Sequence, residues 1–172
     1  DAVEFLGRPD DAQVLYRIWL HKGQLGSKTE MMEASTESKL RLINDSADLS
    51  TFKVRAGANA LCACLHMTQN LNVQLEDQLA ATTTNGILLR YCLPGSWLES
   101  QRQSLITRPL FDAAAFGLVR VHHRSHQEYL AACWLKDLMQ LECRYFELRQ
   151  LIFATGAGNT LTIRPFMKSV AA

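Results

Sequence analysis

Three closely spaced histidines are the residues of this sequence best suited to chemistry. His122, His123 and His126 occur within five positions, inside the segment of residues 121–135. An imidazole can bind a metal, transfer a proton or donate a hydrogen bond to a phosphate. The residues around the histidines decide which of these uses the chain favours.

The residues that follow predict a helix that begins with a side-chain cap. Ser125 is followed three residues later by Glu128, which is the pattern of a capping box. Apolar residues then recur at the spacing of one helix face, at Leu130, Cys133, Trp134 and Leu138. We therefore expect Ser125 and Glu128 to satisfy backbone N–H groups at the start of this helix.

His123 is the histidine best placed to bind an anion. It is expected last before the helix, where backbone N–H groups and the helix dipole favour a phosphate. His122 is expected on the opposite face of the preceding strand, because neighbouring strand residues alternate. His126 is expected to be a structural or surface residue. The sequence therefore predicts His123 as the candidate phosphate ligand.

The same residues do not predict a metal site. A zinc site needs three or four converging ligands. His122 and His126 are four residues apart, but His122 is expected outside the helix, and Glu128 is assigned to the cap. Cys62 and Cys64 are two apart on an expected helix and so point to different sides. We expect no metal at either place.

Neither nucleotide hydrolysis nor nucleophilic catalysis follows from these residues. The segment 23–29 (GQLGSKT) is similar to a phosphate-binding loop, but Ser27 separates Gly26 from Lys28, and a helix rather than a strand is expected before it. No serine lies in the Gly-x-Ser-x-Gly turn of a hydrolase. We expect that this chain is not an enzyme on its own.

The composition is that of an ordinary globular protein and gives no support to nucleic acid or membrane as a partner. Of its 172 residues 48% are hydrophobic and 20% charged, and the net charge is only +1. That balance does not attract nucleic acid or a membrane surface, and the apolar runs are too short to span a bilayer. Five cysteines, an odd number, favour reduced thiols in a cytoplasmic protein over a disulfide framework.

Helical patterns dominate the elements that must position the histidines. Helices are expected near residues 11–21, 28–43, 51–68, 97–106, 125–141, 145–153 and 165–172. Short strands are expected at 71–75, 110–112 and 118–122, the last two as a hairpin, while 86–93 fits helix or strand. Capping is expected from Ser27 with Glu30, from Ser50 or Thr51, and from Ser96. The inward side chains of the first helix are expected to be Val14, Leu15, Ile18 and Trp19.

This order predicts a mainly α fold in three parts. A helical bundle is expected over residues 1–95, a winged-helix-like unit with a short β-hairpin over 96–142, and the start of a helical repeat array over 143–172. The sequence has no initiator Met and ends inside an expected helix, as we expect of a segment of a longer protein.

The segment 120–135 resembles the winged-helix region of bacterial NACHT-type STAND NTPases. Those proteins often carry the motif His-x-Ser-aromatic-Gln-Glu-aromatic-Leu-Ala-Ala, and residues 123–132 (HRSHQEYLAA) match it in order. His126 departs from it, since the family has Phe or another apolar residue there. Weaker similarity extends over nearly the whole chain, including Arg8-Pro9-Asp10 and Arg108-Pro109.

The resemblance implies a regulatory, non-catalytic segment of a signalling switch, of the kind used in antiviral defence. In such proteins a P-loop core, here upstream of Asp1, binds ATP or ADP with Mg²⁺, and the residue matching His123 contacts the ADP β-phosphate to hold a closed state. Arg8 and Pro9 are weaker candidates for nucleotide contact. The implied partners are that core, a downstream repeat or sensor domain, and further copies of the protein on activation. Tight binding of a cofactor to this chain alone is not expected.

Two other classes remain open. A stand-alone winged-helix module that binds DNA or acts as an adaptor would follow from the fold, and it predicts salt-dependent binding to duplex DNA. The near-neutral charge and the acidic Glu128 and Asp137 on the expected recognition helix count against DNA. An enzyme ranks third, because the residues show no catalytic constellation.

Overall fold

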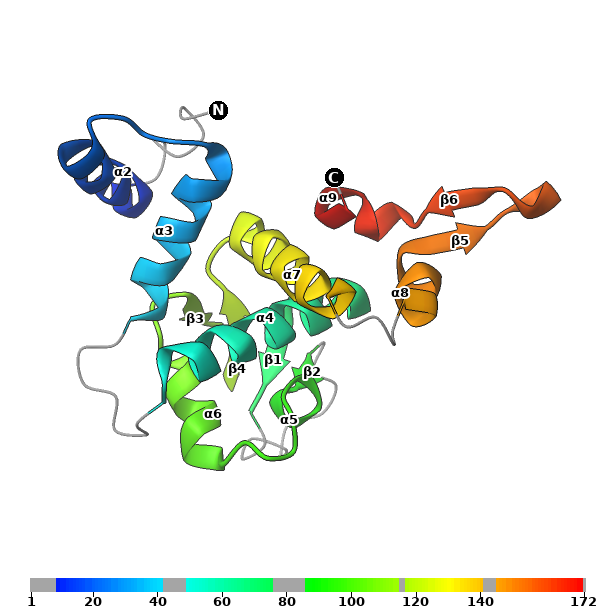
Figure 1. The fold of residues 1–172 in the computed structure, drawn as a ribbon. Helices are drawn as coiled ribbons and strands as arrows, with labels where there is room; N and C mark the ends of the chain where they lie inside the picture. The colour runs from blue at the N-terminus through cyan, green and yellow to red at the C-terminus, as the bar shows by residue number, and fades with distance from the viewer. Residues whose placement is uncertain (1–8, 42–48, 76–85, 115–116, 141–144, 172) are drawn as a thin grey trace.

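The computed structural model describes residues 9–41, 49–75, 86–114, 117–140 and 145–171. They form a mainly helical fold with a small mixed sheet (Figure 1). A helical hairpin stands at one side, two crossing helices fill the middle, and the C-terminal segment extends to the other side.

The N-terminal hairpin is made by α2 (Pro9–Lys22) and α3 (Lys28–Leu40). Gly23 and Gly26 join them in the left-handed region, with φ of 68° and 76°. The Ser27 hydroxyl accepts a hydrogen bond from the Glu30 N–H at 3.2 Å, and the Glu30 carboxylate accepts one from the Ser27 N–H at 2.7 Å. The predicted capping box at this position is confirmed.

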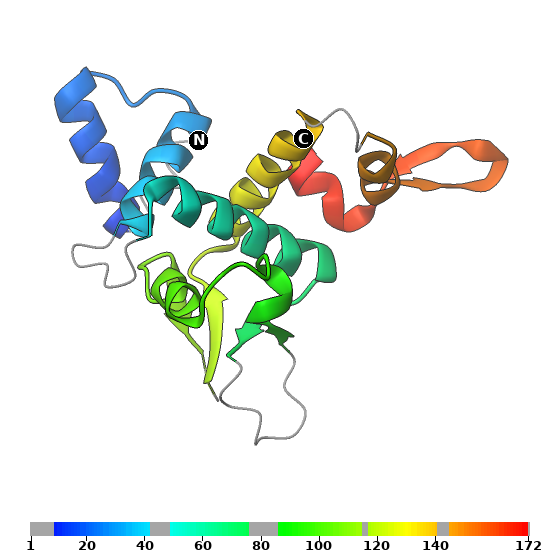
Figure 2. The same cartoon turned by 60° about the horizontal axis from the view of Figure 1, so that its bottom comes forward.

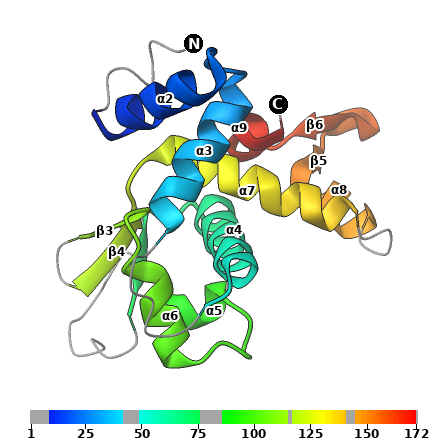
Figure 3. The same cartoon turned by 60° about the vertical axis from the view of Figure 1, so that its left-hand side comes forward.

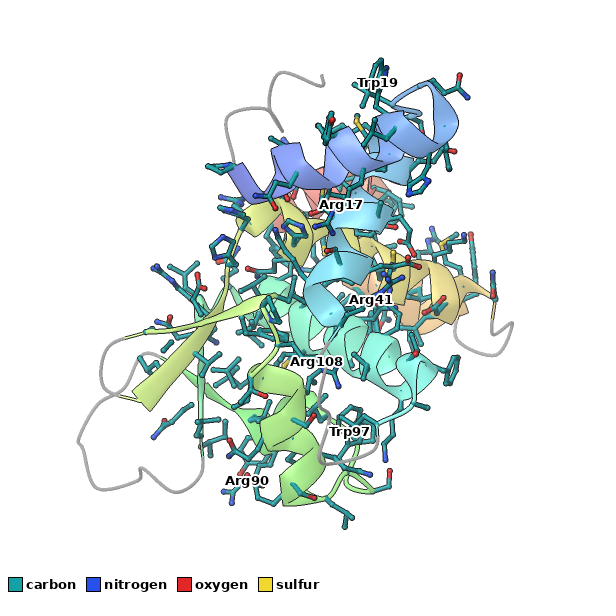
Figure 4. All side chains as sticks on the ribbon, turned by 90° about the vertical axis from the view of Figure 1, so that its left-hand side faces the viewer. Arg17, Trp19, Arg41, Arg90, Trp97 and Arg108 are labelled. Atoms are coloured by element: carbon teal, nitrogen blue, oxygen red, sulfur yellow. The ribbon has the colours of Figure 1, made fainter. Side chains whose placement is uncertain are left out.

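The outward face of α2 differs from the prediction. Leu15 is buried against α3 and Ile18 is partly buried, but Trp19 is 52% exposed beside the exposed Tyr16 and Leu20. Figure 4 shows Trp19 on the outer side of α2. The inward placement of Trp19 is wrong because α2 packs on α3 along a narrow face, so its second apolar row has no helix over it among the described residues.

Two long helices form the centre of the molecule. They are α4 (Thr51–Thr68) and α7 (Arg124–Met139), and they pack extensively on each other. Ser50 caps α4 by accepting from the Lys53 N–H at 3.2 Å, as predicted. Figures 2 and 3 show α4 between α7 on one side and the sheet with the short helices on the other.

The sheet contains β1 (Asn72–Gln74), β2 (Ile87–Leu88), β3 (Phe111–Ala113) and β4 (Leu118–Val121), in the order β2-β1-β4-β3. β1 runs parallel to β2 and antiparallel to β4, and β3 and β4 form the predicted hairpin. Val73, Val119 and Val121 join the main core with Leu61 and Leu65 of α4. This core includes residues on both sides of the predicted division between 95 and 96.

Two short helices lie below α4. Residues 86–93 contribute both β2 and the helical turn α5 (Leu89–Cys92), and α6 (Glu99–Ile106) follows. Leu98, not Ser96, is the N-cap of α6, so the predicted cap is wrong. Trp97 explains the later start: its ring is buried above Gly57 of α4, where an added Cβ would lie 2.4 Å from Trp97 Cη2.

The C-terminal segment mixes helices with a hairpin. It comprises α8 (Tyr145–Ile152), β5 (Phe153–Thr155), the turn η4 (Ala157–Asn159), β6 (Leu161–Ile163), η5 (Pro165–Met167) and α9 (Lys168–Ala171). Its helices pack on the end of α7 through Leu148, Met167 and Val170. The hairpin of β5 and β6 extends away from the body (Figure 1) and was not expected from the sequence.

Candidate functional site

The three histidines meet where β4 passes into α7. His123 is the N-cap residue of α7, with extended backbone angles of −137° and 139°. Its carbonyl accepts hydrogen bonds from the N–H groups of His126 at 3.1 Å and Gln127 at 3.3 Å. The helix therefore begins at Arg124, directly after the histidine that the sequence predicts as a phosphate ligand.

The predicted capping box of Ser125 and Glu128 is wrong. With His123 at the N-cap, Ser125 falls within the first helical turn, and Glu128 lies beyond the position that reaches back to a cap. The Glu128 carboxylate instead accepts a hydrogen bond from Arg124 Nε at 2.9 Å. The sheet sets this start, because the His122 N–H still donates to Leu110 O at 2.9 Å, and the chain turns into the helix immediately afterwards.

The histidine rings lie together rather than on opposite faces. The ring centroids of His122 and His123 are 4.0 Å apart, edge to face, and those of His123 and His126 are 6.0 Å apart and stacked. His122 Nδ1 lies 2.6 Å from Asp112 Oδ2 on β3. The separation expected for His122 and His123 fails because the strand ends at Val121, before either histidine.

His126 belongs to a buried polar network that joins α7 to both N-terminal helices. Its Nε2 lies 3.0 Å from Ser35 Oγ on α3, and that hydroxyl donates to Asp11 Oδ1 on α2 at 2.6 Å. Lys39 Nζ lies 3.1 Å from the same oxygen. Burial raises the pKa of Asp11, but the hydrogen bonds from Ser35 and Lys39 outweigh it and leave this pKa below its ordinary value.

Sequence reasoning did not identify this network. A signal was present on α3, where Ser35 and Lys39 lie four residues apart on the helix face that also carries Met31, Met32 and Leu40. A polar pair in an apolar row indicates a buried partner elsewhere in the chain. His126 is fully buried, so of the two expectations for it the structural one is confirmed.

A second network fixes the next turn of α7. Arg55 Nη2 on α4 donates to Glu33 Oε2 on α3 at 2.7 Å, and the Tyr129 hydroxyl donates to the same oxygen. Burial raises the pKa of Glu33, but the hydrogen bonds from Tyr129 and Arg55 outweigh this effect and leave the pKa below its ordinary value. The pKa of Tyr129 is raised, by burial first and by its bond to Glu33 second. Together the two networks hold the start of α7 against α2, α3 and α4.

A hollow of about 500 Å³ lies between α2 and the hairpin of β3 and β4. Arg17, Lys39, Asp112 and His122 contribute its charged and titratable groups. Figure 4 shows Arg17 on the side of α2 that faces α3, opposite to Trp19. His123 is not part of this lining.

The remaining predicted contacts lie at the edge of the described chain. Pro9 is the exposed first residue of α2, and Arg8 lies outside the described residues. Within the described ranges, no three His, Cys, Asp or Glu side chains converge as metal ligands would. Four cysteines there are free thiols, and Cys143 is outside them.

Comparisons with known proteins do not place the chain in a family. No family model, no curated protein and no solved structure matches it significantly. Among the described helices, none combines the length and the apolar character needed to cross a bilayer.

Proposed function

We propose that this chain is the regulatory, non-catalytic segment of a NACHT-type STAND NTPase. In this proposal β3, β4 and α7 belong to its winged-helix-like unit, and His123 contacts the phosphate of bound ADP to favour the closed state. The N-terminal helices form the preceding helical domain, and the segment from α8 onward starts the repeat array. The protein is cytoplasmic and acts in signalling or antiviral defence.

The position of His123 is the observation that supports the proposal most. It is the N-cap of a 16-residue helix, and it is half-buried between two other imidazoles. A ring N–H at a helix N-terminus is suited to a phosphate, since the dipole and the first N–H groups favour negative charge. The motif match at residues 123–132 names the same residue.

The networks around His123 explain how such a contact could influence other helices. Asp11, Ser35 and Lys39 hold His126, and Glu33 and Arg55 hold Tyr129, so the first two turns of α7 are fixed to α2, α3 and α4. A phosphate held by His123 therefore favours one placement of all four helices. A nucleotide acts as a switch only through such differential contacts between two states.

The nucleotide itself belongs to the upstream core. That core would supply the P-loop and bind Mg²⁺ with ATP or ADP, while this chain contributes His123 and, as weaker candidates, Arg8 and Pro9. The downstream repeat or sensor domain and further copies of the protein are the other partners. We propose no tight binding of ATP or ADP by this chain alone.

The test is His123→Ala in the full-length protein. A hydrogen bond to a charged group contributes about 1.5–3 kcal/mol, so ADP should dissociate at least roughly tenfold faster, and basal oligomerisation should rise. His123→Gln keeps a donor and should lose less. His21→Ala, at the exposed end of α2, is the matched control. Unchanged ADP retention together with unchanged basal activity would refute the assignment.

A separate measurement addresses the DNA-binding alternative. The exposed part of α7 carries Arg124, Lys136 and Asp137, which is a mixed charge rather than a basic stripe. Salt-dependent binding of duplex DNA by this chain would favour the alternative of a stand-alone winged-helix module. Our proposal predicts no such binding at physiological salt.

A further inference from the structure

A second and larger hollow lies at the start of α7. Its volume is about 680 Å³, and its walls come from the end of α4, the link to β1, β4, the first turns of α7 and η5. This size falls in the range of about 300–1,000 Å³ typical of small-molecule sites. Neither His122 nor His123 is among its lining residues.

The charged side chains of this lining are both arginines. Arg120 and Arg124 line it, and no acidic side chain does so within the described part of the chain, although Glu128 forms an ion pair with Arg124 from outside the lining. Arg120 lies on the outer face of β4, because its neighbours Val119 and Val121 face the core. Asp112 on β3 pairs directly across the hairpin from Arg120, and its carboxylate lies 2.6 Å from His122 Nδ1.

Arg124 forms an ion pair with Glu128 through its Nε. Its Nε donates to Glu128 at 2.9 Å, and this bond uses neither Nη group. Its side chain is 83% exposed. A guanidinium presents several N–H donors in a planar fork, which matches the oxygens of a phosphate.

The rest of the lining is rich in amides. Four of its side chains, Gln69, Asn70, Asn72 and Gln127, each carry both donors and an acceptor. Phe166 of η5 adds a half-buried aromatic ring. Such a wall suits a ligand with a polar, hydrogen-bonding body rather than a bare ion.

The walls are connected to each other. His66 Nε2 at the end of α4 lies 2.6 Å from Phe166 O in η5. Gln69 ends α4 in the left-handed region with φ of 55°, and its N–H donates to His66 O at 3.3 Å. Asn72 pairs directly across the sheet from Arg120. A site built on connected elements binds with a smaller loss of conformational freedom.

We propose that this hollow binds a small phosphorylated molecule. Arg120 and Arg124 hold the phosphate, and the amide side chains contact the polar part of the ligand. A sugar phosphate and a nucleotide share this chemistry. The site is separate from the His123 contact and does not depend on it.

Calorimetric titration of the chain tests the proposal with three probes: inorganic pyrophosphate, ribose 5-phosphate and AMP. At least one should bind saturably at low salt. Arg120→Gln and Arg124→Gln should each weaken that binding by about tenfold, as expected for one lost charge-assisted hydrogen bond. Arg90→Gln, an exposed arginine on α5, should leave it unchanged.

The pattern of results separates the outcomes. Tighter binding of ribose 5-phosphate than of pyrophosphate supports a sugar phosphate, and still tighter binding of AMP supports a nucleotide. Absence of saturable binding overturns the proposal. So does equal affinity in Arg120→Gln, Arg124→Gln and the parent chain, with circular dichroism showing that all are folded. Loss of binding in His123→Ala alone would assign the ligand to the other site.

Discussion

The two ends of α7 are held by different kinds of contact. At its start, His126 joins a buried network with Ser35, Asp11 and Lys39. Toward its end, Ala131 and Leu135 pack in an apolar cluster with residues of α8, η5 and α9. One helix is thus fixed by directional bonds at one end and by non-directional packing at the other.

The difference indicates where the molecule can change. A buried polar group that loses its partner costs free energy, so the start of α7 favours a single arrangement. Apolar packing accepts substitutions of similar volume, so the end of α7 tolerates small shifts of its neighbours. We expect any substitution in the polar network at the start of α7 to cost a large part of the stability. At the apolar end of α7, we expect the cost to increase with the side-chain volume that is removed.

Asp11→Ala should give the largest effect. It leaves the Lys39 ammonium, whose side chain is 8% exposed, without its carboxylate partner. The expected loss in the free energy of unfolding is about 3–5 kcal/mol, measured by urea denaturation. Glu37→Ala, on an exposed position of α3, is the control. A loss below about 0.5 kcal/mol, the usual range for surface changes, would show that the polar network does not hold this end.

Met167→Ala tests the apolar end of α7. Met167 is fully buried among Leu135, Leu148 and Val170, so truncation should cost on the order of 3 kcal/mol. Met167→Leu keeps most of the volume and should cost less than about 1.5 kcal/mol. The contrast between the two ends fails if Met167→Leu is as harmful as Met167→Ala in the same denaturation experiment.

Gly57→Ala tests the middle of the molecule, where α4 meets Trp97. The new Cβ would lie 2.4 Å from Trp97 Cη2, so the ring must move. We expect a loss of about 1–3 kcal/mol, measured as a lower thermal midpoint. The double variant Gly57→Ala/Trp97→Leu should show less than the sum of the two single losses, because the clash is removed. Additive losses would refute this explanation.

The free energy of unfolding that the polar network at the start of α7 contributes should fall in acid, whereas the contribution of the apolar cluster at its end should not. The folded-state pKa of Asp11 is lowered from 3.8, so its contribution is fully present above that pH. The contribution is lost as the pH falls from 3.8 through the folded-state value. Asp11→Asn should therefore flatten the fall of stability below that pH, and Met167→Ala should keep the parent slope. Equal slopes in the parent and Asp11→Asn would contradict the assigned pKa direction.

Ser27→Ala should give the smallest effect, because its capping box is exposed. Loss of a serine N-cap costs about 1 kcal/mol. The backbone N–H of Ser27 and, second, its hydroxyl lower the pKa of Glu30, and alanine removes only the hydroxyl. Nuclear magnetic resonance titration should therefore show a higher Glu30 pKa in Ser27→Ala. An unchanged Glu30 pKa would show that the box is open in solution.

Local sequence signals predicted the elements that depend on neighbouring residues. The bounds of α4, its cap at Ser50 or Thr51, the Ser27 capping box and the hairpin of β3 and β4 were all predicted from patterns within a few positions, and the structure selects Ser50. In each case the caps and the apolar spacing agree with the final packing. The mainly helical class follows from the same signals.

The features that the sequence did not predict depend on tertiary packing. Ser125 and Glu128 have the spacing of a capping box, but the hydrogen bond from the His122 N–H to Leu110 O holds the chain just after β4, and the helix starts at Arg124, before Ser125. Trp97 delays α6 because its ring is buried over Gly57. The network at His126 involves residues from α2, α3 and α7, and no local pattern reports which of them meet.

The bond between Ser35 and His126 spans 91 residues of sequence, and this has a consequence for synthesis of the protein. When α2 and α3 leave the ribosome, the imidazole that joins their network has not yet been made. Their contact with His126 cannot form until α4 and the whole sheet have been synthesised, and until then Ser35 and its neighbours remain hydrated. α2 and α3 therefore emerge before α7 but reach their final packing only after it, and a pause in translation before residue 126 would prolong their exposure to proteases and chaperones.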